Sequence, residues 1–407
     1  MDRADLVRRD AADPLAWLRA EFVVPDDRLI YLDGNSLGRP ARGSIEALRE
    51  SAEQEWAGGL IRSWDDWLHL PVEVGEVIGR DFLGARPGET VVADSTSVNF
   101  YRLALAALDA RPDRRVIVTE SGNFPTDDYV LQGIAGRTGH ELRRVPADLD
   151  DGIDPAALAA AIDDDVALVT LSHVSYRSGA VVDLPAVTEL AHRHGALVLW
   201  DLCHSVGSLP IDLVGADADL AVGCTYKYLN GGPGSPAFLY VRRDLQSELD
   251  QPVWGWFGQR EQFEMADRYE AYDDIRRFLV GTPPVLALRS LQSAVEPLAK
   301  AGITALRAKS LELTALAVQL TDKWLTPLGA SLATPRNPER RGGHVTVHHP
   351  RARELASAMT ARGVVPDFRT PDRIRLGLAP ATTSFADVWD AWTVMRELMT
   401  TDKRSPA

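Results

Sequence analysis

From about residue 60 to residue 290, short apolar runs alternate with helix-like segments, and this alternation constrains the fold more than any other feature of the sequence. Two of the runs, VALVTL (166–171) and ALVLWDL (196–202), are apolar without the every-second-residue pattern of a half-exposed strand. Such runs are typical of strands that are covered on both faces. Because repeated strand–helix units connect through right-handed crossovers, the sequence predicts an α/β fold with a mainly parallel sheet flanked by helices.

The pattern changes after about residue 300. Long helical segments are followed by a strand (GGHVTVHH), a helix (RELASAMTARG), a strand (RIRLGLA) and a helix (FADVWDAWTVMREL). A chain of 407 residues is long enough for one large domain and a smaller one. We therefore expect a large domain over residues 51–295 and a small α+β domain over residues 296–407. The first 50 residues could join either part, and we assign them to the small domain.

The composition of the chain limits which binding partners and which cellular compartment we expect for the protein. The formal net charge of −14 argues against nucleic acid or an anionic membrane as the main partner. No apolar run approaches the roughly 18 residues of a membrane span, and the N-terminus lacks the apolar core of a signal peptide. Two cysteines, Cys203 and Cys224, cannot form a disulfide framework. We expect a cytoplasmic protein.

Ligands of open α/β sheets bind beyond the carboxyl ends of the strands, so the strand ends provide the candidate site residues. The first end, ADSTSVNF, places Ser95, Thr96 and Ser97 between a strand and the first turn of a helix. Free N–H groups, the helix dipole and hydroxyl donors favour an anion there. An ordinary helix cap is the alternative.

The second strand end, WDLCHS, places Asp201 after a buried apolar run and His204 three residues later. A buried carboxylate is costly unless it meets a cation or several donors, although Asp201 could also cap a helix. Cys203 and its neighbouring histidine lack a second ligand pair at zinc spacing, so we expect no metal.

The third strand end, VGCTYKYLNGGPGS, carries Lys227 between two tyrosines, with three glycines and a proline just beyond. The lysine could extend to solvent or act as a nucleophile, and the glycines suit a loop folded tightly around a ligand. The fourth end, SGNFPTDD, places Phe124 before a proline, which favours extended backbone and an aromatic face for stacking or for core packing.

Together the four strand ends supply an anion site, a carboxylate, an aromatic ring and a lysine in one crevice. These groups match the requirements of pyridoxal phosphate, which has a phosphate, a protonated pyridine nitrogen, a planar ring and an aldehyde that condenses with lysine. The sequence therefore predicts a pyridoxal-phosphate enzyme.

At this level of detail the chain resembles the kynureninase family, which belongs to the fold type I pyridoxal-phosphate enzymes. The similarity covers nearly the whole chain. It rests on the segments YLDGNSLG (31–38), GLIRSW (59–64), NFPTD (123–127), LSHVSYRSG (171–179), WDLCHSVGSLP (200–210), GCTYKYLNGGPGS (223–235), GWFG (255–258) and FLVGTPP (278–284).

The resemblance implies a role for each matching residue. Lys227 binds the cofactor aldehyde and moves protons at the substrate Cα, Asp201 keeps the pyridine nitrogen protonated, and Tyr226 holds the phosphate or relays protons. The implied cofactor-binding residues are Thr96, Ser97, Phe124, Asp127, Ser172, Asp201, His204, Tyr226, Lys227, Trp256 and Thr282. The implied substrate-binding residues are Ser36, Trp64, Gly281 and Arg375, of which Arg375 clamps the α-carboxylate.

The implied reaction is hydrolysis of L-kynurenine to anthranilate and L-alanine, as in tryptophan catabolism and NAD biosynthesis. Trp256 and Thr282 resemble residues that reach the phosphate from a second subunit, so the resemblance implies a homodimer with shared sites. Trp64, Gly281 and Thr282 resemble the bacterial pocket, which is associated with kynurenine and leaves 3-hydroxykynurenine as an alternative substrate. The segment SWDDWLHLPVEVGE (63–76) and Ser175 depart from the usual bacterial pattern and affect the expected tolerance for ring substituents.

Three alternatives remain from the residues themselves. A class V aminotransferase would also need the lysine, and a desulfurase-like lyase would need a mobile cysteine late in the chain. No cysteine follows Cys224, which disfavours the lyase. A cofactor-binding protein without catalysis would leave the carboxylate-binding Arg375 without a purpose.

Overall fold

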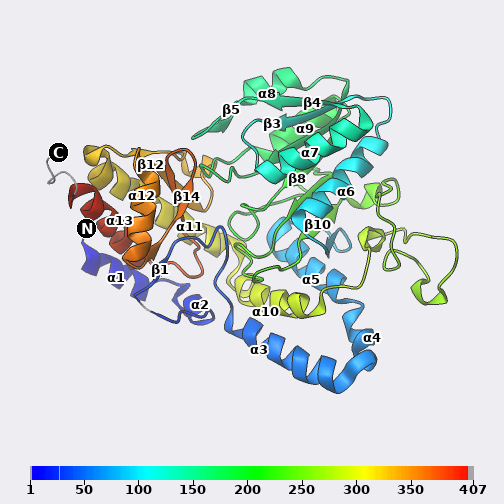
Figure 1. The fold of residues 1–407 in the computed structure, drawn as a ribbon, viewed down its shortest axis with the longest axis horizontal. Helices are drawn as coiled ribbons and strands as arrows, with labels where there is room; N and C mark the ends of the chain where they lie inside the picture. The colour runs from blue at the N-terminus through cyan, green and yellow to red at the C-terminus, as the bar shows by residue number, and fades with distance from the viewer. Residues whose placement is uncertain (1, 27, 402–407) are drawn as a thin grey trace.

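The computed structural model describes residues 2–26 and 28–401, and a seven-stranded sheet forms the centre of its larger part (Figure 1). Strands β9, β8, β7, β3 and β4 are parallel, whereas β10 runs antiparallel to both of its neighbours. The predicted mainly parallel sheet is confirmed. In spatial order the strands are β2 (Thr90–Val92), β10 (Phe238–Val241), β9 (Leu220–Gly223), β8 (Leu197–Asp201), β7 (Val166–Ser172), β3 (Val116–Glu120) and β4 (Glu141–Val145).

Helices cover both faces of this sheet, which explains why the central strands are apolar throughout. Every residue of β7 and β8 is buried. One face packs against α6 (Thr96–Asp109) and α7 (Pro125–Thr138). The other face packs against α5 (Leu70–Ile78), α8 (Pro155–Ala161), α9 (Leu184–Arg193) and α10 (Val285–Ala301).

The smaller part of the molecule has an antiparallel sheet and a core of its own. The sheet order is β11 (Ser331–Leu332), β12 (His344–His348), β15 (Arg373–Gly377) and β14 (Asp367–Arg369). Its helices are α11 (Ile303–Leu320), α12 (Ala352–Ala361) and α13 (Phe385–Thr401). Trp392 of α13 is fully buried in this core.

The first 50 residues contact both parts. Helix α1 (Arg3–Ala11) packs against α13, and β1 (Ile30–Tyr31) pairs with β13 (Val364–Val365). In contrast, α2 (Ala16–Ala20) and α3 (Arg42–Glu50) pack against α10. Helix α10 continues without a break to Gly302, whose positive φ separates it from α11. We therefore propose a domain boundary at Gly302, with the first 50 residues bridging the two domains.

The remaining elements lie at the edges of the larger part. A short hairpin, β5 (Ala147–Asp148) and β6 (Gly152–Ile153), extends toward the smaller part (Figure 1). Helix α3 continues through π-helical and 3-10 turns over residues 51–63 into α4 (Trp64–Trp67), at the lower end of the molecule. Among residues 2–26 and 28–401, no helix combines the length and apolar character that crossing a membrane requires.

Candidate active site

Lys227 lies in the loop that follows β9, at the carboxyl edge of the sheet. Its Nζ is 2.9 Å from Nε2 of His204, which lies in the loop after β8. The Nζ is also 6.0 Å from the centre of the Phe124 ring, at the start of α7. Lys227 therefore points into the crevice between three strand ends, as the sequence predicts, and not into bulk solvent.

The loop around Lys227 is held tightly on both sides. Thr225 Oγ1 donates to the Pro236 carbonyl oxygen at 2.7 Å, and the Gly231 N–H donates to the Thr225 carbonyl oxygen at 2.9 Å. The N-terminal segment packs on the other side, since a Cβ at Gly38 would lie 2.3 Å from the Lys227 carbonyl oxygen. The glycines of both segments thus allow the close backbone approach that fixes the lysine.

Two carboxyl groups lie side by side in this crevice. Asp201, the last residue of β8, accepts hydrogen bonds from the Cys203 N–H at 2.7 Å and from Ser172 Oγ at 3.4 Å. Asp127, in the first turn of α7, is almost fully buried. Burial, and next the charge of Asp201, raise the pKa of Asp127 well above its ordinary value. Within the described chain, Asp127 Oδ2 has no hydrogen-bond donor.

The buried imidazole of His204 is held neutral. Burial, and next the charge of Lys227, hold the pKa of His204 well below its ordinary value. A neutral Nε2 can accept a hydrogen bond from the Lys227 ammonium group, which orients the lysine. No partner of the other ring nitrogen, Nδ1, lies within residues 2–26 and 28–401.

The structure brings nine of the predicted cofactor residues together around one pocket. The N-terminus of α6 forms its edge, and Ser95 caps this helix by accepting from the Val98 N–H at 3.4 Å, so the cap interpretation holds for Ser95. The pocket is lined by Thr96, Ser97, Phe124, Thr126, Asp127, Ser172, Tyr176, Asp201, Cys203, His204, Tyr226 and Lys227.

Thr282 lines an adjoining cavity together with Ser95, Thr96, Ser97 and Tyr226 of the same chain. Thr282 therefore already lies near the predicted phosphate position within one chain. Its contact from a second subunit stays a prediction. Gly281 is exposed beside it, and a Cβ there would meet no atom within 4 Å.

Trp64 and Trp256 do not line the Lys227 pocket. Their ring centres are 6.0 Å apart at an interplanar angle of 62°, and both rings contact Phe257. The two predicted residues thus form an aromatic cluster of their own, at the side where α4 meets the 252–281 loop.

Arg375 and Ser36 are brought together at the small-domain side of the site. The buried Arg375 guanidinium donates through Nη1 to the Tyr176 carbonyl oxygen at 2.6 Å and through Nη2 to Ser36 Oγ at 2.8 Å. Nη2 also forms an ion pair with Asp367. The Nε atom is buried and has no acceptor in the described part of the chain.

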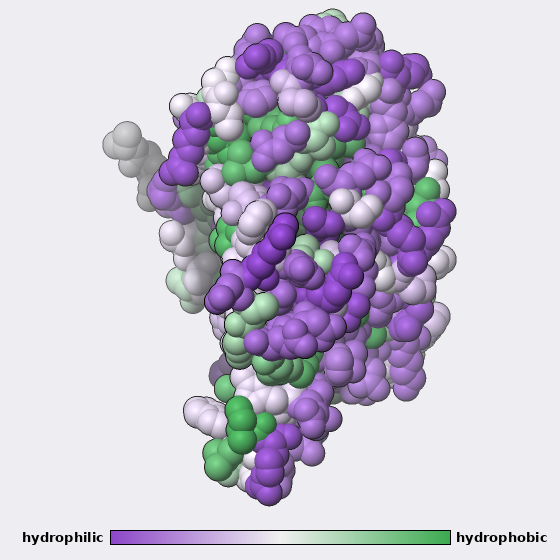
Figure 2. All heavy atoms as spheres, turned by 90° about the vertical axis from the view of Figure 1, so that its right-hand side faces the viewer, coloured by the Kyte–Doolittle hydropathy of each residue, from purple (hydrophilic) through white to green (hydrophobic). Residues whose placement is uncertain are grey.

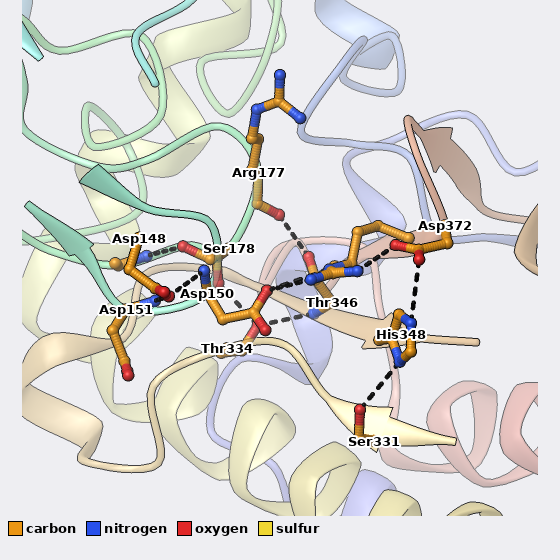
Figure 3. Close-up of polar contacts among 12 residues, drawn as sticks. Asp148, Asp150, Asp151, Arg177, Ser178, Ser331, Thr334, Thr346, His348 and Asp372 are labelled. Atoms are coloured by element: carbon orange, nitrogen blue, oxygen red, sulfur yellow. Dashed lines mark hydrogen bonds and ion pairs between the residues drawn. The ribbon is translucent and has the colours of Figure 1, made fainter. Parts of the chain in front are cut away.

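Contacts between the two domains hold the strand that carries Arg375 (Figure 3). On this strand, Arg373 forms an ion pair with Asp150 of the β5–β6 hairpin at 2.9 Å. Thr346 Oγ1 on the neighbouring strand β12 donates to the Arg177 carbonyl oxygen at 2.6 Å, and Thr334 Oγ1 donates to the Ser178 carbonyl oxygen at 2.7 Å. Arg375 therefore has a fixed position relative to the strand ends of the large domain.

Sequence reasoning missed three side chains at this site. Tyr176 packs edge-to-face on Phe124, with ring centres 5.4 Å apart. His344 of β12 lies 5.6 Å from the His204 ring, and Asp367 pairs with Arg375. Tyr176 lies within a segment that carries the family resemblance, whereas His344 and Asp367 come from the other domain, where no strand-end rule applies.

Comparisons with known proteins show similarity to kynureninases along nearly the whole chain. One family model, described as the kynureninase C-terminal domain, matches residues 306–395, and one for the DegT/DnrJ/EryC1/StrS aminotransferase family matches residues 80–222. A protein named kynureninase from Pseudomonas fluorescens is 42% identical over 405 residues, covering 98% of this chain and 95% of the relative. Another from Burkholderia pseudomallei (strain 1106a) is 42% identical over 408 residues, covering 98% and 96%.

Solved structures with the same fold come from more distant proteins. A cysteine desulfurase from Thermococcus onnurineus NA1 has a TM-score of 0.83 at 20% identity, covering 95% of this chain and 98% of that chain. The cystine C–S lyase C-DES has a TM-score of 0.81 at 18% identity, covering 91% and 98%. These likenesses show that the chain has the fold type I architecture.

Proposed function

The chain belongs to the kynureninase family, and we propose that it hydrolyses the Cβ–Cγ bond of L-kynurenine to give anthranilate and L-alanine, with pyridoxal phosphate as cofactor. The observation that carries the proposal is the arrangement of one crevice. Lys227 and Asp201 of the large domain line the pocket, and Arg375 of the small domain donates to the carbonyl oxygen of Tyr176, which also lines it. A cofactor-dependent reaction at the Cα of an amino acid needs a lysine for the aldehyde, a carboxylate for the ring nitrogen and an arginine for the substrate carboxylate.

The residues of the pocket fit this cofactor. Asp127 and Asp201 are buried together with an unused carboxylate oxygen, and a protonated ring nitrogen would satisfy them. The N-terminus of α6, with Thr96 and Ser97, would hold the phosphate. When bound, pyridoxal phosphate would supply an electron sink for the negative charge that develops at the substrate Cα.

Lys227 would hold the cofactor aldehyde and move the proton at the substrate Cα. His204 supports this role because a neutral imidazole can keep the Nζ in place through a hydrogen bond without repelling it as a second cation. Proton transfer by a positioned side chain accelerates reactions by roughly 10²–10⁴-fold.

Tyr226 would act as a hydrogen-bond donor to the phosphate. Burial is the main cause that raises the pKa of its phenol above the ordinary value. At neutral pH the hydroxyl therefore keeps its proton, which favours the donor role over the role of a general base.

Arg375 would bind the substrate α-carboxylate, and Ser36 would orient the arginine. Two of its nitrogens are held by Tyr176 and Ser36, so the planar fork is fixed before substrate arrives. The buried Nε has no acceptor in residues 2–26 and 28–401, and it is the donor that a carboxylate would satisfy.

The aromatic cluster of Trp64 and Trp256 would bind the aryl ring of the substrate from a second subunit. In one chain the cluster lies outside the Lys227 pocket, so this role would place the cluster at the site of a partner copy. An aromatic side chain at position 64 offers stacking area but no acceptor for a ring hydroxyl. We therefore propose kynurenine as the preferred substrate over its 3-hydroxy derivative.

We further propose that two copies of the chain form this shared site through the lower end of the molecule. Apolar side chains gather there in Figure 2, on the part that Figure 1 shows to be α3 and the turns after it. Ile45 is 52% exposed, Leu60 58% and Ile61 73%. Exposed apolar patches of this kind mark interaction sites.

The change Ile61→Asp should shift the protein from dimer toward monomer in light scattering coupled to size exclusion. Val7→Asp on α1, which alters an exposed valine at the other end of the molecule, should leave the mass unchanged. A wild-type protein that is monomeric at micromolar concentration would remove the dimer from the proposal.

A cytoplasmic location fits the two free thiols, Cys203 and Cys224, which are buried and not joined in a disulfide. Cell fractionation tests this location.

The function itself is tested by adding L-kynurenine to the purified holoenzyme. Equal amounts of anthranilate, detected by its fluorescence, and alanine are expected. Transfer of the amino group to a keto acid without anthranilate would instead indicate an aminotransferase.

A further inference from the structure

A second cavity adjoins the cofactor pocket, and residues of helices α8 and α9 line it. Its volume is about 510 Å³, which is within the range of small-molecule sites. Helices α8 and α9 and the β5–β6 hairpin form its walls, and the turn at Pro338–Arg340 of the small domain closes one side. Arg340 ties that turn to the hairpin through a bond to the Asp151 carbonyl oxygen at 2.9 Å.

The walls of this cavity are aliphatic. Ile153, Leu158, Val182, Val187 and Leu190 line it from four different segments. Such walls exclude hydrated ions and provide no ring of oxygen ligands for a metal. They suit an organic molecule with an apolar body.

One buried polar group faces this apolar space. Glu120, the last residue of β3, lines the cavity and is only 5% exposed. One of its carboxylate oxygens accepts from the Ser172 N–H at 3.1 Å. No second hydrogen bond to the Glu120 carboxyl group is present in the described chain, so its other oxygen is available to an occupant. A buried carboxyl group with an unused oxygen favours a ligand that carries a donor or a positive charge.

The charges at the mouth favour a cation. Asp151, Asp183 and Glu339 line the cavity together with one cation, Arg340. With Glu120, four acidic side chains therefore stand against one basic side chain. A carboxylate or phosphate ligand would be repelled, whereas an ammonium ion would gain a charge-assisted hydrogen bond to a buried carboxyl group.

We propose that this cavity binds a small organic ammonium ion, with its nitrogen on Glu120 and its apolar body against α8 and α9. The site is separate from the proposed active site, because Glu120 and Ser172 stand between the two pockets. The inference does not depend on the reaction that the enzyme catalyses.

The probe for this site is N,N-dimethylbenzylamine, a tertiary amine that is protonated at neutral pH and cannot condense with an aldehyde. Isothermal titration of the holoenzyme should show binding with a dissociation constant in the millimolar range. Glu120→Gln should weaken binding at least tenfold, because the neutral amide keeps the shape but cannot become the carboxylate that pairs with the ammonium ion. Glu339→Gln, an exposed acid at the mouth, should change affinity less than about threefold, because solvent screens its charge.

A second pair of variants tests the location without altering a buried group. Ala186→Phe on α9 places a ring in the cavity from an exposed position and should abolish binding. Ala160→Phe, at an exposed position of α8 that does not line the cavity, should leave binding unchanged. Three outcomes would overturn the proposal: no binding of the probe in the millimolar range, equal binding to wild type and Ala186→Phe, or displacement of the probe by anthranilate.

Discussion

The proposed active site has a large-domain wall, which carries Asp127 and Asp201, and a small-domain wall, which carries Arg375. The two walls differ in how far their buried charged groups are paired within the chain. On the large-domain wall, Asp127 and Asp201 lie together, and one carboxylate oxygen has no donor among the described residues. On the small-domain wall, Arg375 is already paired with Asp367 and bonded to Ser36. The first wall therefore needs a cationic group to complete it, whereas the second keeps only one donor, Nε, for a ligand.

This difference suggests that the two walls bind different molecules. The large-domain wall would be completed by the cofactor and the small-domain wall by the substrate. Variants of the first wall should change the visible spectrum, and variants of the second should change KM while the spectrum is kept.

Lys227→Ala is expected to have the largest effect. Removing the amino group would remove both the proposed covalent link to the cofactor and the proposed base at the substrate Cα. The visible absorption band should disappear, and turnover should fall by a factor of about 10²–10⁴ or more. Absorption spectra and anthranilate fluorescence measure the two effects. Lys323→Ala, at an exposed lysine of the small domain, is the matched control. A retained band in Lys227→Ala would place the covalent link elsewhere.

Arg375→Ala should have the next largest effect, and only on substrate. A hydrogen bond to a charged group is worth about 1.5–3 kcal/mol, so KM should rise about 10- to 100-fold. The visible band should stay at wild-type intensity. Arg375→Lys keeps the charge but loses the planar fork, so its KM should lie between the KM of the wild type and that of Arg375→Ala. Loss of the visible band in Arg375→Ala would mean that the small-domain wall also binds the cofactor, which would contradict the proposed difference between the two walls.

Asp367→Asn should have a smaller effect in the opposite direction. In the proposed site Asp367 would compete with the substrate carboxylate for Arg375, and Ser36 and Tyr176 would still hold the arginine when the charge is removed. We expect KM to fall by about two- to fivefold, a change of less than about 1 kcal/mol, with kcat nearly unchanged. Steady-state kinetics with L-kynurenine decides the sign. An increase in KM would mean that Asp367 orients Arg375.

The same contrast explains what sequence reasoning could find. Lys227, Asp201, Thr96 and Phe124 all follow strands of one parallel sheet, and topology alone brings the carboxyl ends of such strands to one edge. Arg375 comes from an antiparallel strand of the other domain, so only the family resemblance indicated it. Asp367 and His344 gave no signal, because their relevance depends on how the two domains pack.

Glu120 shows a signal that was present and missed. It ends the apolar run RRVIVTE in the same way as Asp201 ends ALVLWD, and a carboxyl group at the end of a buried strand needs a partner in both places. We propose to move the boundary predicted near residue 295 to Gly302, and the reason is local. The helical pattern continues to Gly302, where a positive φ ends α10.

The last expected effect concerns the free energy of unfolding and not catalysis, and it extends the comparison to Glu120, the carboxyl group behind the large-domain wall. Burial raises the pKa of Glu120 to about 7, from an ordinary value of 4.5. The folded protein therefore binds this proton more tightly than the unfolded chain does. The resulting stabilisation is complete below about pH 4.5, falls as the pH rises, and is lost above about pH 7, with a total of about 3 kcal/mol.

Glu120→Gln cannot lose a proton, so its thermal midpoint should gain on that of the wild type as the pH rises from 4.5 to 7. The difference between the two proteins is the useful quantity, because His173 contributes in the opposite direction to both. Burial lowers the pKa of His173 to about 4, so its contribution to stability grows as the pH rises toward 6.5. Glu339→Gln, which changes an exposed acid, should run parallel to the wild type across this range. A gap between Glu120→Gln and wild type that does not change with pH would mean that Glu120 is ionised in the folded protein, paired with a cation as the Asp127–Asp201 pair is proposed to be.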